Sequence, residues 1–238
     1  MSIHITNIMK TLTQEDILNH KDLKHSLEVV DQVSKGIRGY VCHQMIHVLY
    51  VLKELMGDEC KNYLEIGTHN GGSIMTVMQS EYETNFYGVD VWGGDVNRQY
   101  AQENITKHNK HQHNFELIKG NSMSDNTFNN VVKECPSVDF LFIDGGHTYE
   151  NVINDFGRYS KLVNTGGLIV FDDYLMFERP NPFDDVQKER KGQVRLAVDD
   201  IVSKLGDSYN IIGILPNEAG AITNINIDYN VSFIIQKL

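Results

Sequence analysis

The sequence predicts a doubly wound α/β domain with a mostly parallel, seven-stranded sheet and an antiparallel last strand. Short apolar runs alternate with helix-like stretches from residue 62 onward, which is typical of parallel βα units. Glycines follow the first run directly, and acidic residues follow later runs at the strand ends where such sheets bind ligands. No helical period separates the last two runs, so we expect a closing hairpin.

Each predicted element follows from its own pattern of apolar residues. The strands are Tyr63–Ile66, Phe86–Val89, Phe115–Ile118, Val138–Ile143, Gly167–Phe171, Tyr209–Leu215 and Val231–Ile235. The helices between the first six are Gly72–Gln79, Gln99–His108, Asp125–Glu134, Tyr149–Leu162 and Val194–Leu205. The chain therefore reads as successive βα units up to the hairpin.

We divide the chain into an N-terminal helical cap, residues 1–58, and an α/β domain, residues 59–238. Residues 13–57 read as two or three helices, one with an apolar stripe that leads into the first strand. This stripe could pack against the sheet, close a ligand pocket or contact a second copy of the chain. A homo-oligomer is therefore one of the alternatives. The polar segment 174–192 contains two prolines and is predicted to be a lid-like insertion.

Composition excludes several classes of function. The formal net charge of -11, from 32 acidic and 21 basic residues, disfavours binding to nucleic acid or to anionic membranes. The three cysteines have no CxxC spacing, which argues against a disulfide framework and a zinc site. No apolar run approaches the ~20 residues of a membrane span, so we expect a cytoplasmic protein.

A cofactor turn is predicted directly after the first strand, where Glu65 precedes the glycines of the segment Gly67–Ser73. A dinucleotide fingerprint would need a second glycine where His69 stands, so a pyrophosphate is disfavoured. The carboxylate of Glu65 suits the ammonium group of an aminoacyl cofactor. Asp90 ends the second strand, 23 residues after Gly67, and suits the hydroxyls of a ribose.

Further cofactor contacts are expected at the ends of the second, third and fourth strands. Asn121 and Ser122 would meet an adenine edge, and Trp92 would stack on the adenine face. The complete candidate set is Glu65, Gly67, Thr68, Asn70, Gly71, Ser73, Asp90, Trp92, Asn121, Ser122 and Asp144. The alternatives are a tight turn without a ligand and, for Asp90, a helix N-cap.

Three acids are predicted to meet at the ends of the fourth and fifth strands. Asp144 follows the fourth strand, and Asp172 and Asp173 follow the fifth. Adjacent parallel strands lie ~4.8 Å apart, so these carboxylates would hold a hard divalent cation such as Mg²⁺, Mn²⁺ or Ca²⁺. His147 is the candidate general base for an acceptor hydroxyl. Solvated acids and a helix-capping histidine are the simpler alternatives.

The two constellations together resemble a known family. The E-x-G-x-x-x-G turn at Glu65, the acid Asp90 and the seven strands resemble the class I S-adenosylmethionine-dependent methyltransferases, which have a Rossmann-like fold, over about residues 60–238. The D-x-x-H segment from Asp144 and the Asp172–Asp173 pair resemble the metal-dependent sugar and macrolide O-methyltransferases and the cephalosporin-hydroxylase-like branch. Asp172 departs from that branch, where this position is often Glu.

The resemblance implies a metal-assisted O-methyltransferase that uses S-adenosylmethionine and Mg²⁺, or another divalent ion such as Mn²⁺ or Ca²⁺. Its acceptor would be a small hydroxyl-bearing molecule such as a sugar or a natural product, with no nucleic-acid or membrane partner. The alternatives are a metal-independent or N-directed methyltransferase and a non-catalytic cofactor-binding protein. The [DNS]-P-P-[YF] motif of base-methylating enzymes is absent.

Overall fold

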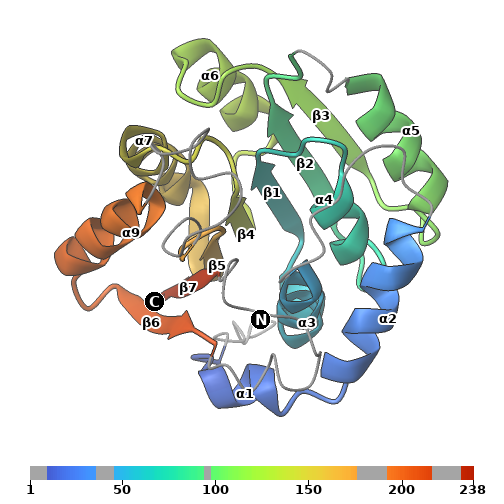
Figure 1. Cartoon of the computed structure of the whole chain (residues 1–238), viewed down its shortest axis with the longest axis horizontal. Coiled ribbons are helices and arrows are strands. Elements are labelled where there is room, and N and C mark those ends of the chain that lie inside the picture. The colour runs from blue at the N-terminus through green and yellow to red at the C-terminus, as the bar shows by residue number, and fades with distance from the viewer. Residues whose placement is uncertain (1–9, 36–45, 94–97, 176–191, 216–231) are drawn as a thin grey trace, which may run out of the picture.

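A seven-stranded sheet of order β3-β2-β1-β4-β5-β7-β6 forms the centre of the computed structural model (Figure 1). The structure describes residues 10–35, 46–93, 98–175, 192–215 and 232–238. The strands are β1 (Asn62–Ile66), β2 (Asn85–Asp90), β3 (Phe115–Lys119), β4 (Val138–Ile143), β5 (Val163–Phe171), β6 (Tyr209–Ile214) and β7 (Phe233–Lys237). Strand β7 is antiparallel to β5 and β6, and the pairs among β1 to β5 are parallel. The predicted fold class and closing hairpin are therefore confirmed.

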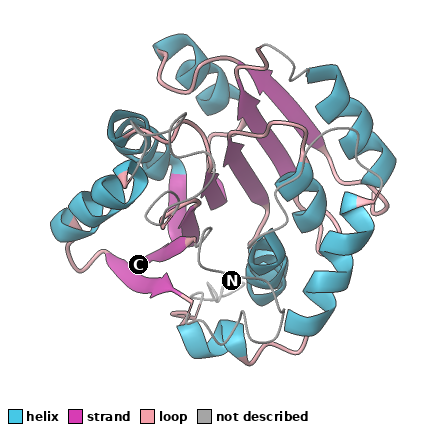
Figure 2. Ribbon diagram, in the orientation of Figure 1, coloured by secondary structure: helices cyan, strands magenta, loops and turns pink. Residues whose placement is uncertain are grey.

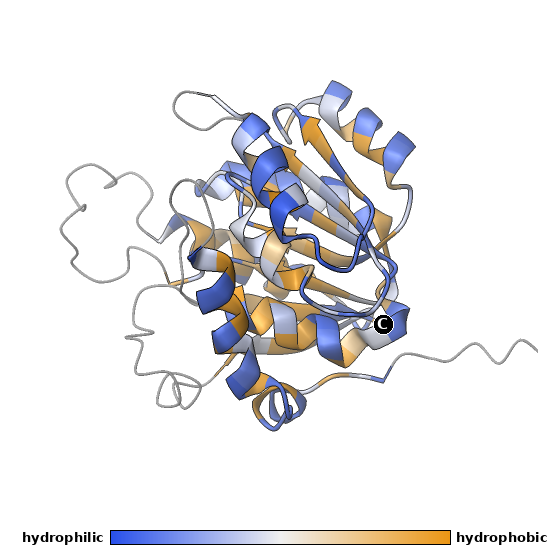
Figure 3. Cartoon of the chain, turned by 90° about the vertical axis from the view of Figure 1, so that its right-hand side faces the viewer, coloured by the Kyte–Doolittle hydropathy of each residue, from blue (hydrophilic) through white to orange (hydrophobic). Residues whose placement is uncertain are grey.

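Helices cover both faces of the sheet (Figure 2). They are α1 (Gln14–Leu18), α2 (Leu23–Ser34), α3 (Ile46–Met56), α4 (Gly72–Val77), α5 (Arg98–His108), α6 (Asp125–Glu134), α7 (Tyr149–Tyr159) and α9 (Gln193–Lys204). Successive strand residues point to opposite faces, so Tyr63 packs with α2 to α5 while Leu64 packs with α6, α7 and α9. Figure 3 shows the strands mostly in apolar colours and the outer helix faces in polar ones.

The N-terminal helices are tied to the sheet at two places. Helix α3 is buried along nearly its whole length and packs against α2 and α4. The buried side chain of Gln236 on β7 accepts a hydrogen bond from the Leu12 N–H at 2.8 Å and donates to the carbonyls of Lys10 and Gly166. A buried amide that is fully hydrogen-bonded fixes the entry of the chain.

Most element bounds lie within a few residues of the prediction. Strand β5 begins four residues earlier, because a register irregularity lets Val163 pair with Val138 before the regular ladder starts at Leu168. The predicted helix over 149–162 ends as α7 at Tyr159 and continues as a 3₁₀ turn, Ser160–Leu162. The lid-like insertion predicted at 174–192 lies almost entirely outside the described residues.

No helix within the described ranges is long and apolar enough to cross a bilayer.

One close backbone approach fixes the geometry between β1 and β4. Gly67 follows β1 with a φ of 99°, and a Cβ atom at this position would lie 1.8 Å from the Asp144 carbonyl oxygen. The Asp144 N–H donates to the Ile66 carbonyl at 2.8 Å, so the two strand ends are held together. Only glycine combines this positive φ with the space available.

We expect Gly67→Ala to lower the free energy of unfolding by more than about 3 kcal/mol, because the new methyl group would displace backbone and not a flexible side chain. Gly157→Ala is the matched control, since no atom lies within 4 Å of the position a Cβ would take there. That helical control should be neutral or stabilising by up to about 1 kcal/mol. Urea unfolding of both variants measures the difference, and equal midpoints would contradict the strand-end constraint.

Candidate functional site

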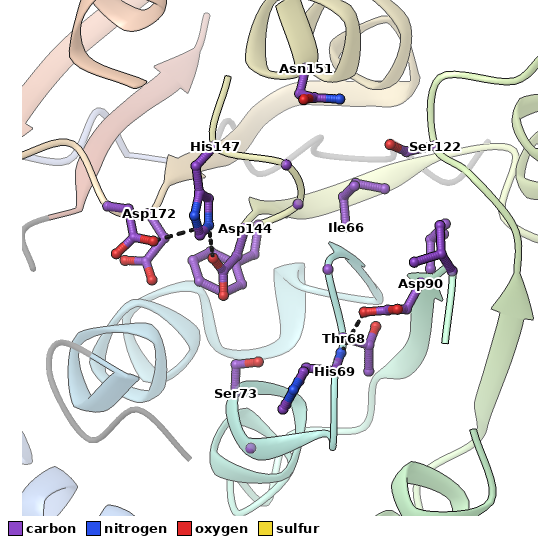
Figure 4. A pocket seen from close by; sticks show the side chains of 18 of the residues that line it. Ile66, Thr68, His69, Ser73, Asp90, Ser122, Asp144, His147, Asn151 and Asp172 are labelled. Carbon is purple, nitrogen blue, oxygen red and sulfur yellow. Dashed lines mark hydrogen bonds and ion pairs between the residues drawn. The ribbon is translucent and has the colours of Figure 1, made fainter. Parts of the chain in front are cut away.

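A cavity of about 600 Å³ opens at the carboxyl ends of β1, β2, β3, β4 and β5 (Figure 4). Ligands of open α/β sheets bind at this edge. The predicted site residues on its wall are Gly67, Thr68, Asn70, Ser73, Asp90, Asn121, Ser122, Asp144, His147, Asp172 and Asp173. The cavity therefore joins the predicted cofactor turn to the predicted catalytic acids.

Asp90 lines the cavity and also stabilises the turn after β1 by hydrogen bonds. Its Oδ2 accepts a hydrogen bond from the His69 N–H at 2.8 Å, and its Oδ1 accepts from the Trp92 N–H at 2.7 Å. His69 has a φ of 48°, a left-handed conformation that this contact supports. A carboxylate has about four lone-pair positions, so Asp90 keeps acceptor capacity for a ligand.

Glu65 is fully buried beneath the turn on the face that α4 covers. Its Oε2 accepts a hydrogen bond from the Tyr63 hydroxyl at 2.7 Å, and its Oε1 has no partner among the described residues. Burial raises the pKa of Glu65 to about 7, against the opposing effect of the Tyr63 hydrogen bond. An unpaired buried carboxylate oxygen indicates a site built for a cationic group.

The structure does not place three predicted cofactor residues on the cavity wall. Glu65 lies below the turn, and Gly71 begins α4 with a φ of 86° while facing Ile105. Trp92 turns inward, because its φ of 39° lets the indole N–H donate to the His69 carbonyl at 2.7 Å. Trp92 thus supports the turn through its side chain, which only the backbone conformation could show, and cofactor contacts of Glu65 and Gly71 stay predictions.

Asn151 is a cavity residue that the sequence analysis missed. It lies in the first turn of α7, and its amide nitrogen donates to the Met123 sulfur at 2.8 Å. Its side chain also contacts the Thr148 hydroxyl, while the Asn151 N–H donates to that hydroxyl at 3.2 Å. The T-x-x-N spacing at a helix start was the available signal, and it predicts a cap and not a ligand contact.

Asp144, His147 and Asp173 converge at one end of the cavity, where Figure 4 shows His147 next to Asp144. His147 Nε2 lies 3.1 Å from Asp173 Oδ2 and 3.6 Å from Asp144 Oδ1. One ligand atom from each side chain lies within 4.8 Å of the other two, as a metal site requires. This is the only such group of three or more among the residues that the structure describes.

Asp172 lines the same cavity but is engaged elsewhere. Its Oδ1 accepts a hydrogen bond from the Ser232 hydroxyl at 2.7 Å, next to β7. It is not among the three side chains that converge, so the predicted set of three acids is only partly assembled. Asp173 has a φ of 58° and is therefore turned away from the regular strand direction toward His147.

Burial raises the pKa values of the acids in the cavity, and neighbouring acids add to this effect for Asp144 and Asp172. Burial, together with the charges of Asp172 and Asp173, holds the pKa of Asp144 well above its usual range. Burial and the neighbouring Asp173 raise the pKa of Asp172 to about 7. Like charges in a partly desolvated space repel, so positive charge in this cavity would be stabilised.

Comparison with known proteins agrees with this geometry. A family model described as a methyltransferase domain matches residues 64–174. An uncharacterized protein of Acanthamoeba polyphaga mimivirus is 34% identical over 214 residues, which cover 86% of this chain and 91% of that protein. Residues 64–174 therefore belong to the methyltransferase domain family, and the fold is that of the class I S-adenosylmethionine-dependent enzymes.

Solved structures show the same fold. An O-methyltransferase from Bacillus cereus in complex with SAH superposes with a TM-score of 0.62 at 20% identity, covering 94% of each chain. The O-methyltransferase TomG from Streptomyces achromogenes, in complex with SAM, superposes with a TM-score of 0.56 at 13% identity, covering 94% of this chain and 96% of that one. The predicted Rossmann-like architecture is therefore that of this class.

The buried carboxyl of Glu65 predicts a pH-dependent stability. Its folded pKa of about 7 lies above the ordinary value of 4.5, so its contribution to stability is fully present below pH 4.5 and is lost as pH rises through 7. We expect the stability gain of Glu65→Gln over the parent to grow by about 3 kcal/mol between pH 5 and pH 8, without cofactor. Urea unfolding at both pH values measures this gain, and a gain independent of pH would disprove the shift.

Proposed function

We propose that this methyltransferase is a metal-assisted O-methyltransferase that transfers the methyl group of S-adenosylmethionine to a hydroxyl of a small acceptor. The observation that carries the proposal is the single cavity that joins the β1 turn and Asp90 to Asp144, His147 and Asp173. A cofactor at the first end would direct its methyl group toward an acceptor at the second. Positioning of this kind supplies most of what methyl transfer needs, because the sulfonium methyl is already electrophilic.

The residues of the cavity suit the parts of the cofactor. Asp90 has free acceptor positions for ribose hydroxyls, and Asn121 and Ser122 lie next to it for the adenine edge. The aminoacyl end would lie over the turn at Gly67 and Ser73, with the buried charge of Glu65 beneath. A cationic ligand would relieve the repulsion among these acids.

The acid cluster fits a divalent cation. Asp173 is 4% exposed, and its Oδ1 has no hydrogen-bond partner among the described residues, which is unfavourable unless a positive group binds there. Asp144 and Asp173 would supply oxygen ligands. The cation would lower the pKa of an acceptor hydroxyl and orient it. The protein's own part is to hold the two carboxylates beside the cofactor.

A small hydroxyl-bearing acceptor, such as a sugar or another natural product, fits this end of the cavity best. The wall there is polar and acidic, and the chain's net charge of -11 disfavours a phosphate-rich polymer. Hydroxyl groups are suitable ligands for a cation held by carboxylates.

We expect Asp90→Ala to weaken S-adenosylmethionine binding by roughly 2–4 kcal/mol, because two charge-assisted hydrogen bonds to the ribose would be lost. Calorimetric titration measures this effect. Asp125→Ala, an exposed acid in the first turn of α6, is the control and should bind as the parent does. Because Asp90 also supports the turn, thermal unfolding must first show that the variant is folded. Unchanged affinity in a folded variant would contradict the ribose assignment.

Chelation should abolish methyl transfer while leaving cofactor affinity unchanged, because the acid cluster holds the acceptor end of the cavity. Asp173→Asn should do the same, whereas the exposed control Asp58→Asn should keep full activity. The assay uses radiolabelled S-adenosylmethionine with a panel of sugars, glycosylated compounds and phenols, and the product is examined by NMR for an O-methyl signal.

Three results would contradict parts of this proposal. Full activity in excess chelator would exclude the metal, and a label on nitrogen would exclude O-methylation. Cofactor binding without transfer to any acceptor, including those in a small-molecule extract, would favour a non-catalytic binding protein.

A further inference from the structure

The sequence predicted His147 as a general base, but its Nε2 lies close to two carboxylates that line the same end of the cavity. His147 Nε2 lies 3.1 Å from Asp173 Oδ2 and 3.6 Å from Asp144 Oδ1. A base must reach the hydroxyl proton within about 2.6–3.2 Å. The short distances from Nε2 to two carboxylates suit a shared metal ion better than a free general base.

Asp173 is held in this cluster against two unfavourable effects. Its φ of 58° is a left-handed conformation, which is uncommon for residues other than glycine. Its side chain is only 5% exposed, and its Oδ1 has no hydrogen-bond partner in the described part of the chain. Strained backbone and an unpaired buried charge occur together at ligand sites.

The two separations from His147 Nε2 to the carboxylates fit ligands of one ion. Ligand atoms that share an ion at about 2.0–2.2 Å, with angles of about 90–110°, lie about 2.9–3.6 Å from each other. The two separations from His147 Nε2, 3.1 Å and 3.6 Å, both fall in this range. An ion pair between His147 and Asp173 alone would explain the distance of 3.1 Å. It would leave Asp173 Oδ1 without a partner.

We propose that His147 is a ligand of the divalent ion, together with Asp144 and Asp173, and that its nitrogen makes the site prefer Mn²⁺, Fe²⁺, Co²⁺ or Zn²⁺ to Mg²⁺ and Ca²⁺. This inference rests on the metal site of the proposed function and refines it. Three carboxylates would select hard ions, whereas an imidazole donor favours transition metals. The hydrogen bond from Ser232 to Asp172 is consistent with a ligand set in which histidine takes the third place.

Metal binding to the purified, metal-free protein tests this inference without any acceptor. We expect Mn²⁺ and Co²⁺ to bind at least about tenfold more tightly than Mg²⁺ in calorimetric titrations. Loss of a residue that only supports a metal ligand costs about 10–100-fold in affinity, so His147→Ala should weaken Mn²⁺ binding by about 100-fold or more. Mg²⁺ binding should change far less, so the preference should shrink.

A spectroscopic measurement separates coordination from an indirect effect. Electron spin-echo modulation of the Mn²⁺-loaded protein should show coupling to a directly bound ¹⁴N nucleus, and His147→Ala should remove it. His25→Ala is the matched control, because this exposed histidine pairs with Glu28 on α2 and should leave both signal and affinity unchanged.

Each outcome decides between the alternatives. Tight Mn²⁺ binding that His147→Ala leaves unchanged would overturn the ligand assignment but would keep the metal mechanism and favour the base. A wild-type protein that binds none of these ions would overturn both. Cofactor titration in the same samples shows whether the methyltransferase assignment stands independently.

Discussion

The contact between Gly67 and the Asp144 carbonyl determines where the two ends of the site lie. Strands β1 and β4 pair in parallel up to Ile66 and Ile143, and each strand ends at that residue. Gly67 has no side chain, so the cofactor turn can lie directly against the backbone of Asp144. The same glycine therefore serves the turn geometry and the distance between cofactor and acceptor.

Charge is the second constraint. Asp90, Asp144, Asp172 and Asp173 line one cavity, and Glu65 lies buried beneath its turn. Burial, together with repulsion from neighbouring acids, raises the pKa values of Glu65, Asp144 and Asp172. A site with so much unpaired negative charge is arranged for positive ligands, and a sulfonium cofactor and a divalent ion meet that requirement together.

The residues at the end of β2 stabilise the cofactor turn through hydrogen bonds. Asp90 and Trp92 bind the backbone of His69 from either side, so the end of β2 fixes the loop after β1. This arrangement gives Trp92 a structural part in place of stacking. It also explains why a histidine is accepted in a left-handed conformation where a dinucleotide fingerprint would have glycine.

Local pattern in the sequence determined the sheet, its closing hairpin and the strand ends that carry Gly67, Asp90, Asp144 and Asp173, because periodicity and turn residues act over short stretches. The direction of side chains beyond those ends was decided only by tertiary structure. The inward turn of Trp92, the pairing of Asp172 with Ser232 and the placement of His147 Nε2 between two acids depend on backbone angles and on partners far away in the chain. No local pattern contains that information.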